Sequence, residues 1–136
     1  MDKNLTGVIF FSILLSSCSL STTQEMELRE SGARQLTQSE IINSYIGNTL
    51  SGKTPDGSAF HVYIPDNKQF FMYYEGEKSH GQWRISDDPS FCYVMDGDTV
   101  EYCTREYMQD ERIKSVNPDG TIAGTAQIRP GNPEDL

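Results

Sequence analysis

The sequence predicts a mainly β protein: a small antiparallel β-barrel or sandwich of about eight strands with one short N-terminal helix. Beyond Gly47, short apolar segments are separated by turn residues at intervals of roughly ten, which is typical of such folds. Alternation supports this locally, so positions 60, 62 and 64 of Phe60–Ile64 would face inward, whereas residues 70–74 are apolar on both faces. The connections have hairpin composition, as in Pro55-Asp56-Gly57.

The chain begins with the layout of a secretory signal peptide. Residues 5–15 read LTGVIFFSILL, eleven residues without a charge, and they follow Lys3 and precede small residues. A membrane-spanning helix needs about 20 apolar residues, which is more than this run supplies. We therefore expect residues 1–17 to be a cleaved leader.

Leu15-Ser16-Ser17-Cys18 resembles the lipobox of bacterial lipoproteins: an aliphatic residue, two small residues and a cysteine. The resemblance implies that Cys18 becomes the first residue of the mature chain and carries a lipid, such as palmitate, that anchors it in a membrane. Because Ser19 stands where lipoproteins retained in the inner membrane carry aspartate, the resemblance implies the bacterial outer membrane. The alternative is an ordinary secretory leader cut near Ser17 or Ser21.

The chain is acidic, with 20 Asp and Glu against 11 Lys and Arg and a formal net charge of −9. The leader contains one acid and one base, Asp2 and Lys3, so its removal leaves this charge unchanged. Nucleic-acid binding depends on basic residues that neutralise phosphates, and attraction to anionic lipids does as well. The charge argues against both kinds of partner and favours solubility.

Residues 18–36 are expected to form the lipidated N-terminus and a flexible tether, because they contain few large apolar residues. A short helix around residues 25–34 is the alternative, but Met26 and Leu28 are two positions apart and form no helical stripe. Residues 37–129 are expected to form one small β-barrel-like domain. Residues 130–136 would be a C-terminal tail on the surface.

One helix is predicted at about residues 38–46. Thr37-Gln38-Ser39-Glu40 has the form of a capping box. Ile41, Ile42, Tyr45 and Ile46 follow at helical spacing, and Gly47 offers a C-terminal stop. We expect this helix to cover one end of the β structure.

Eight strands are predicted from the apolar segments and the turn residues between them. Their ranges are 48–53, 59–64, 69–74, 81–85, 91–95, 100–108, 112–116 and 121–128.

The three cysteines divide into one lipidation candidate and one pair. If Cys18 carries lipid, Cys92 and Cys103 remain for a disulfide in an exported protein. A two-residue hairpin loop at Gly97-Asp98 would pair residues whose numbers sum to 195. Cys92 and Cys103 meet this condition, so they would lie opposite each other. The Asp96-Gly97 dipeptide itself favours the loop position, so the register stays open.

No catalytic or metal-binding set is predicted, and no cofactor. His61 and His80 have no cysteine or histidine at metal-ligand spacing, and we interpret both as surface residues. With Cys92 and Cys103 paired, no thiol is left as a nucleophile. No serine lies in a G-x-S-x-G elbow.

The acidic residues gather in three places: Asp87-Asp88, Asp96 with Asp98, and Asp110-Glu111. Paired carboxylates can catalyse hydrolysis, and aspartate-rich loops can bind calcium. Each pair coincides with a predicted turn, where aspartate bonds its own backbone. We therefore interpret these acids as turn residues.

Gly81-Gln82-Trp83 resembles the G-x-W motif of lipocalins, although in that family the motif opens the first strand and here it lies mid-domain. We interpret Trp83 as a core residue, with Gly81 allowing close backbone approach. More broadly, the chain resembles a class of small exported bacterial proteins of uncharacterised function, which implies a β-rich domain. The residues that carry this resemblance are Glu40-Ile41, Gly47-Asn48-Thr49-Leu50, Gly81-Gln82-Trp83, Cys92, Cys103 and Gly131-Asn132-Pro133.

These observations favour a non-enzymatic lipoprotein of the cell envelope that binds a protein or an envelope component, with binding residues that the sequence does not identify. The first alternative is an inhibitor of a protease or lysozyme, since known envelope inhibitors are small stapled β-barrels on lipid tethers. The second is a hydrolase that uses one carboxylate pair. It would need two acids that converge in a pocket.

Overall fold

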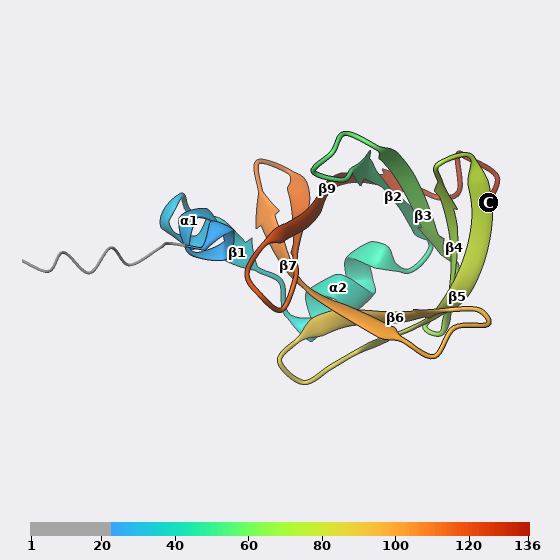
Figure 1. The fold of residues 1–136 in the computed structure, drawn as a ribbon, viewed down its shortest axis with the longest axis horizontal. Helices are drawn as coiled ribbons and strands as arrows, with labels where there is room; N and C mark the ends of the chain where they lie inside the picture. The colour runs from blue at the N-terminus through green and yellow to red at the C-terminus, as the bar shows by residue number, and fades with distance from the viewer. Residues whose placement is uncertain (1–22) are drawn as a thin grey trace, which may run out of the picture.

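A closed antiparallel barrel of eight strands forms the body of the protein (Figure 1). The computed structural model describes residues 23–136. Each strand pairs with the next along the chain, so the barrel is an up-and-down meander. Its strands are β2 (Asn48–Lys53), β3 (Ala59–Ile64), β4 (Gln69–Tyr74), β5 (Glu77–Ile85), β6 (Ser90–Met95), β7 (Glu101–Gln109), β8 (Arg112–Val116) and β9 (Ile122–Pro130).

Pairing between the first and last strands closes the barrel. β9 lies between β8 and β2, and its register with β2 runs from Asn48↔Pro130 to Lys53↔Thr125. Gly52 makes this contact possible, because a Cβ atom there would lie 2.0 Å from the carbonyl oxygen of Thr125. The mainly β prediction is confirmed, and of its two forms the barrel is the one that forms.

Helix α2 (Gln38–Tyr45) lies across one end of the barrel, as predicted (Figure 1). Its capping box forms: the Thr37 hydroxyl accepts from the amide of Glu40, whose carboxylate accepts from the amide of Thr37. Ile41 and Tyr45 are fully buried in the main core. The helix therefore closes this end of the barrel.

The segment before α2 is folded where a flexible tether was expected, so this part of the prediction is wrong from residue 23 onward. Helix α1 (Gln24–Glu30) and strand β1 (Arg34–Gln35) lie outside the barrel, and β1 pairs with β7. Residues 18–22 lie outside the described residues.

A carboxylate holds α1 against the barrel wall. Both Glu25 oxygens accept from Arg105 at 2.7 Å, and one also accepts from the Tyr107 hydroxyl at 2.6 Å. The Arg105 guanidinium is the main reason that the pKa of Glu25 falls from 4.5 to about 2. Leu28 adds an apolar contact with Tyr107 and Val116. Both side chains of the Glu25–Arg105 ion pair are mostly buried. The pair therefore holds α1 in a fixed position on the barrel wall.

A disulfide joins Cys92 on β6 to Cys103 on β7. The two residues are register partners with Cα atoms 4.0 Å apart, which confirms that they lie opposite each other. The loop between β6 and β7 is longer than a two-residue hairpin loop. It contains a tight turn in which Gly97 has a φ of +81° and the Asp98 amide donates to the Met95 carbonyl. The bond closes a short loop in a domain with a modest core.

Side chains that alternate along the strands point into the barrel and form its core. Phe60, Val62 and Ile64 face inward, as predicted. Trp83 is 6 % exposed, stacks on Phe91 with ring centroids 5.2 Å apart, and donates from Nε1 to the Asp66 carbonyl at 3.0 Å. Trp83 is therefore the core residue that the sequence predicted.

The C-terminal residues lie on the barrel surface. The Thr49 hydroxyl donates to the Gly131 carbonyl at 2.7 Å, and Asn132 bonds the backbone of Leu136 in both directions. None of the helices in the described part of the chain combines the length and the apolar content of a membrane-crossing segment.

Candidate functional site

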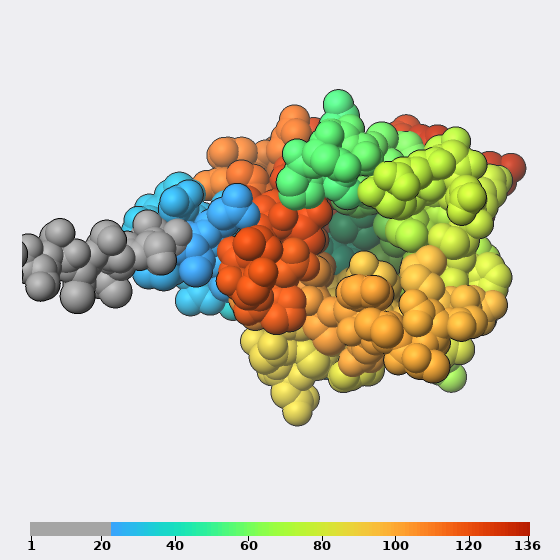
Figure 2. Space-filling model, viewed as in Figure 1, coloured from blue at the N-terminus to red at the C-terminus, as the bar shows by residue number. Residues whose placement is uncertain are grey.

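The interior of the barrel contains a cavity of about 390 Å³ above α2. Figure 2 shows the ring of strands hollowed at its centre, with blue-green atoms of the α2–β2 region at the bottom. The cavity continues to the end opposite α2, where Thr54, Tyr74, Tyr102 and Ala123 lie at its mouth. An eight-stranded barrel is just wide enough to hold one small ligand.

The cavity wall is mostly apolar and rich in aromatic side chains. Tyr93 stacks on Tyr102 with centroids 5.6 Å apart, and Tyr102 is 49 % exposed at the mouth. Such walls with few polar groups are typical of small-molecule sites. The aromatic side chains of the wall are Phe60, Phe70, Tyr74, Phe91, Tyr93 and Tyr102.

One carboxylate lies inside this apolar wall. Glu106 is 2 % exposed and projects inward from β7. Its Oε1 accepts from the Thr104 hydroxyl at 3.0 Å, and its Oε2 accepts from the Ser115 hydroxyl at 2.5 Å. In the part of the chain that the structure describes, this carboxylate takes part in no ion pair.

Burial controls the protonation of this group. Loss of solvation raises the pKa of Glu106 from 4.5 to about 7, although the Ser115, Thr104 and Tyr45 hydroxyls favour its charged form. The Tyr45 hydroxyl is also buried close to this carboxylate, but among the described residues it meets no partner in hydrogen-bond geometry. Its pKa is raised well above 10, first by burial and then by the nearby carboxylate. Tyr45 therefore remains a donor that points at the cavity.

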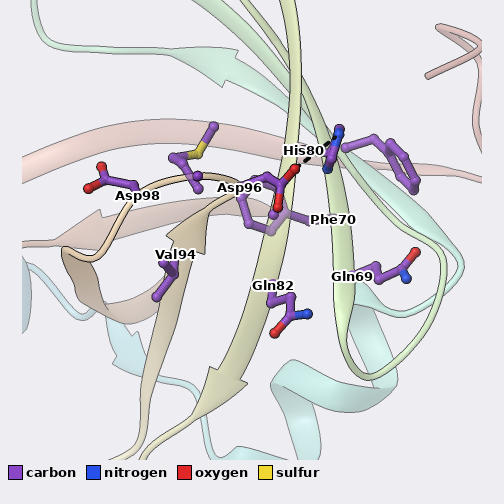
Figure 3. A pocket seen from close by; sticks show the side chains of 11 residues that line it. Gln69, Phe70, His80, Gln82, Val94, Asp96 and Asp98 are labelled. Carbon is purple, nitrogen blue, oxygen red and sulfur yellow. Dashed lines mark ion pairs between the residues drawn. The ribbon is translucent and has the colours of Figure 1, made fainter.

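A second hollow, of about 490 Å³, lies on the outer wall over β4, β5 and β6 (Figure 3). Gly81 is part of its lining, and a Cβ there would lie 2.1 Å from the Val94 carbonyl oxygen and 2.9 Å from the Phe70 ring, so the strands approach each other closely at this point. His80 Nε2 lies 3.7 Å from an Asp96 oxygen, and these side chains are 59 % and 72 % exposed. Such solvated groups bind ligands weakly, so the interior cavity is the better candidate despite its smaller volume.

The predicted site residues lie apart from this cavity. Cys18 is outside the described residues, and Cys92 and Cys103 lie on the outer face of their strands. His61 also faces outward, with Nδ1 2.8 Å from the Ser51 hydroxyl. Of the described residues, one group has metal-ligand spacing, namely Cys92, Glu101 and Cys103, and its sulfur atoms are held in the disulfide.

The three acidic pairs lie on three separate turns. Asp88 accepts from the Ser86 and Ser90 hydroxyls, and Asp98 accepts from the amides of Thr99 and Val100. Asp110 and Glu111 form the β7–β8 turn with positive φ angles of 50° and 62°. The fold does not bring these pairs together into one pocket.

No protein-family model, curated protein or solved structure matches this chain.

Sequence reasoning did not identify Glu106. The residue lies in a predicted strand, and alternation places it on one face with Tyr102, Thr104 and Met108. The opposite face carries a similar mixture, and α1 covers its Tyr107. Because polarity does not distinguish the two faces, the sequence gives no sign of which one lines the barrel.

Proposed function

We propose that the protein is a non-enzymatic binding module whose barrel holds one small, largely apolar molecule. The observation that carries this proposal is the cavity of about 390 Å³, which opens at one end of a barrel that α2 closes at the other. Its size lies within the range of ligand pockets, and its polar groups gather at Glu106. An envelope component of this chemistry would fit the cavity.

Titration with N-phenyl-1-naphthylamine, a neutral apolar dye that fluoresces when it leaves water, tests this proposal. We expect a saturable rise in fluorescence. Val62 lines the cavity, so Val62→Trp should fill it and lower the affinity about tenfold or more, equal to about 1.4 kcal/mol.

Tyr63→Trp is the matched control, because it enlarges the next residue of the same strand on the outer face. This variant should bind the dye with nearly wild-type affinity. Equal dye affinity for the wild type and a folded Val62→Trp, with folding verified by circular dichroism, would disprove binding inside the barrel.

We also propose that Cys18 anchors the domain to the bacterial envelope, in the outer membrane. The lipobox-like Leu15-Ser16-Ser17-Cys18 supports this address, and so does the use of the other two cysteines in a disulfide. Only five residue steps separate Cys18 from Thr23, a reach of at most about 18 Å. Since α1 is fixed to the barrel wall, an anchored domain would lie close to the lipid surface.

Mass spectrometry of the mature protein, with and without reduction, tests this anchor. The expected mass is that of a chain starting at Cys18 with acyl groups attached, and it should increase by two hydrogens when Cys92 and Cys103 are reduced. Cys18→Ala should lose the acyl mass and release the protein from membranes. A mature chain that starts elsewhere and carries no acyl group would contradict the anchor.

A further inference from the structure

The carboxylate of Glu106 is buried in the cavity, and within residues 23–136 no basic side chain pairs with it. Buried charges in proteins are normally paired, because an unpaired charge loses its solvation without compensation. Among the described residues that line the cavity, none is basic. Two hydroxyls bond Glu106, one to each oxygen, and the nearby Tyr45 hydroxyl can take a third of the about four acceptor positions of a carboxylate. Acceptor capacity is therefore left for a group that enters with the ligand.

The walls next to this carboxylate suit a positive charge. Phe91 and Tyr93 both line the cavity with ring centroids 6.1 Å apart, and Tyr102 extends the aromatic surface to the mouth. Aromatic faces attract cations, most strongly where water is excluded. The net charge of −9 also raises the local concentration of cations around the protein.

We infer that the ligand of the barrel is a hydrophobic amine, whose ammonium group pairs with Glu106 and whose apolar body lies against the aromatic wall. This inference rests on the proposed function. An ammonium group can donate three hydrogen bonds, so it can reach the free acceptor positions of the carboxylate. An alcohol of the same shape donates only one, and a carboxylate ligand is repelled.

Three ligands with one shared body separate these cases: 4-phenylbutylamine, 4-phenylbutanol and 4-phenylbutyrate. In calorimetric titrations at pH 8, the amine should bind at least about tenfold more tightly than the alcohol, and 4-phenylbutyrate should bind most weakly. Glu106→Gln should lower the amine affinity on the order of 10- to 100-fold and change the alcohol affinity little. Glu27→Gln removes the same charge from the exposed face of α1 and should change neither affinity.

The pH dependence of the wild type gives a second readout that needs no variant. The titratable groups that face Glu106 are Tyr45 from α2 and Tyr93 from β6, and both have a pKa above 10. Neither titrates between pH 6 and 8. Amine binding requires the charged carboxylate, so the affinity should fall about tenfold from pH 8 to pH 6, with proton release on binding at pH 6.

The outcomes separate the inference from the proposed function. Equal affinities for the amine and the alcohol, or an amine affinity independent of pH and of Glu106→Gln, would overturn the amine inference and leave a neutral apolar ligand. Dye binding without amine binding would overturn it as well. If neither the dye nor any of the three ligands binds, the proposed function itself fails.

Discussion

Replacing Glu106 by glutamine should stabilise the ligand-free protein at pH 8 and leave its stability nearly unchanged at pH 5. The folded protein holds this carboxyl group with a pKa of about 7, against 4.5 for an ordinary glutamate. Because the folded state binds the proton more tightly, stability is lost as the pH rises from 4.5 through 7. A difference of this size corresponds to on the order of 3 kcal/mol.

Glutamine keeps the size of the side chain and removes the charge, so Glu106→Gln should be free of this loss. Urea unfolding at several pH values between 5 and 8, followed by the fluorescence of the single tryptophan, measures the difference. Glu27→Gln on the outer surface of α1 controls for the change in net charge. A Glu106→Gln curve parallel to the wild-type curve over this range would show that the carboxylate is solvated in the folded protein.

The same buried charge has a functional meaning. The unpaired carboxylate lowers the stability of the free protein at neutral pH. A cationic ligand that pairs with this carboxylate compensates its charge, so ligand binding stabilises the folded state. The amine proposed above should therefore raise the melting temperature of the wild type more than that of Glu106→Gln. Both effects depend on the absence of a basic side chain from the described cavity wall.

Trp83→Ala should lower the free energy of unfolding by about 4 kcal/mol. Trp83 is 6 % exposed and stacks on Phe91, and its Nε1–H binds the Asp66 carbonyl, so the alanine leaves both a cavity and a lost hydrogen bond. Tyr73→Ala is the control, since Tyr73 is 39 % exposed on the outer wall and should cost about 1 kcal/mol or less.

Circular dichroism is the suitable readout for this pair, because Trp83→Ala removes the only tryptophan. Unfolding of both variants in urea at one pH gives the two free energies. Similar losses for Trp83→Ala and Tyr73→Ala would show that the barrel is not packed on Trp83.

Most of the barrel could be predicted because its signals are local. Turn residues and alternation set the bounds of β2, β3, β4 and β8, and these four strands have the predicted bounds. β5 begins four residues earlier than predicted, at Glu77. Its first residues carry no apolar alternation, and they are strand because they pair with β4.

The remainder depends on contacts between distant parts of the chain. Alternation could not choose between barrel and sandwich, since that choice depends on the pairing of β2 with β9. Helix α1 has no apolar stripe, and Glu25 bound to Arg105, 80 residues away, holds it in place. Glu106 was missed for the same kind of reason, because the surroundings of β7 decide which of its mixed faces is the interior.

Methyl NMR of the methionines provides the decisive measurement on the hollow barrel. Met72 and Met95 line the cavity, whereas Met26 is 48 % exposed on α1 outside the barrel. With N-phenyl-1-naphthylamine added to protein carrying labelled methionine methyl groups, the Met72 and Met95 signals should shift in a saturable way and the Met26 signal should not. A dye that binds while the Met72 and Met95 signals stay in place would show that the ligand sits on the outside, and the barrel would then be a scaffold without an internal site.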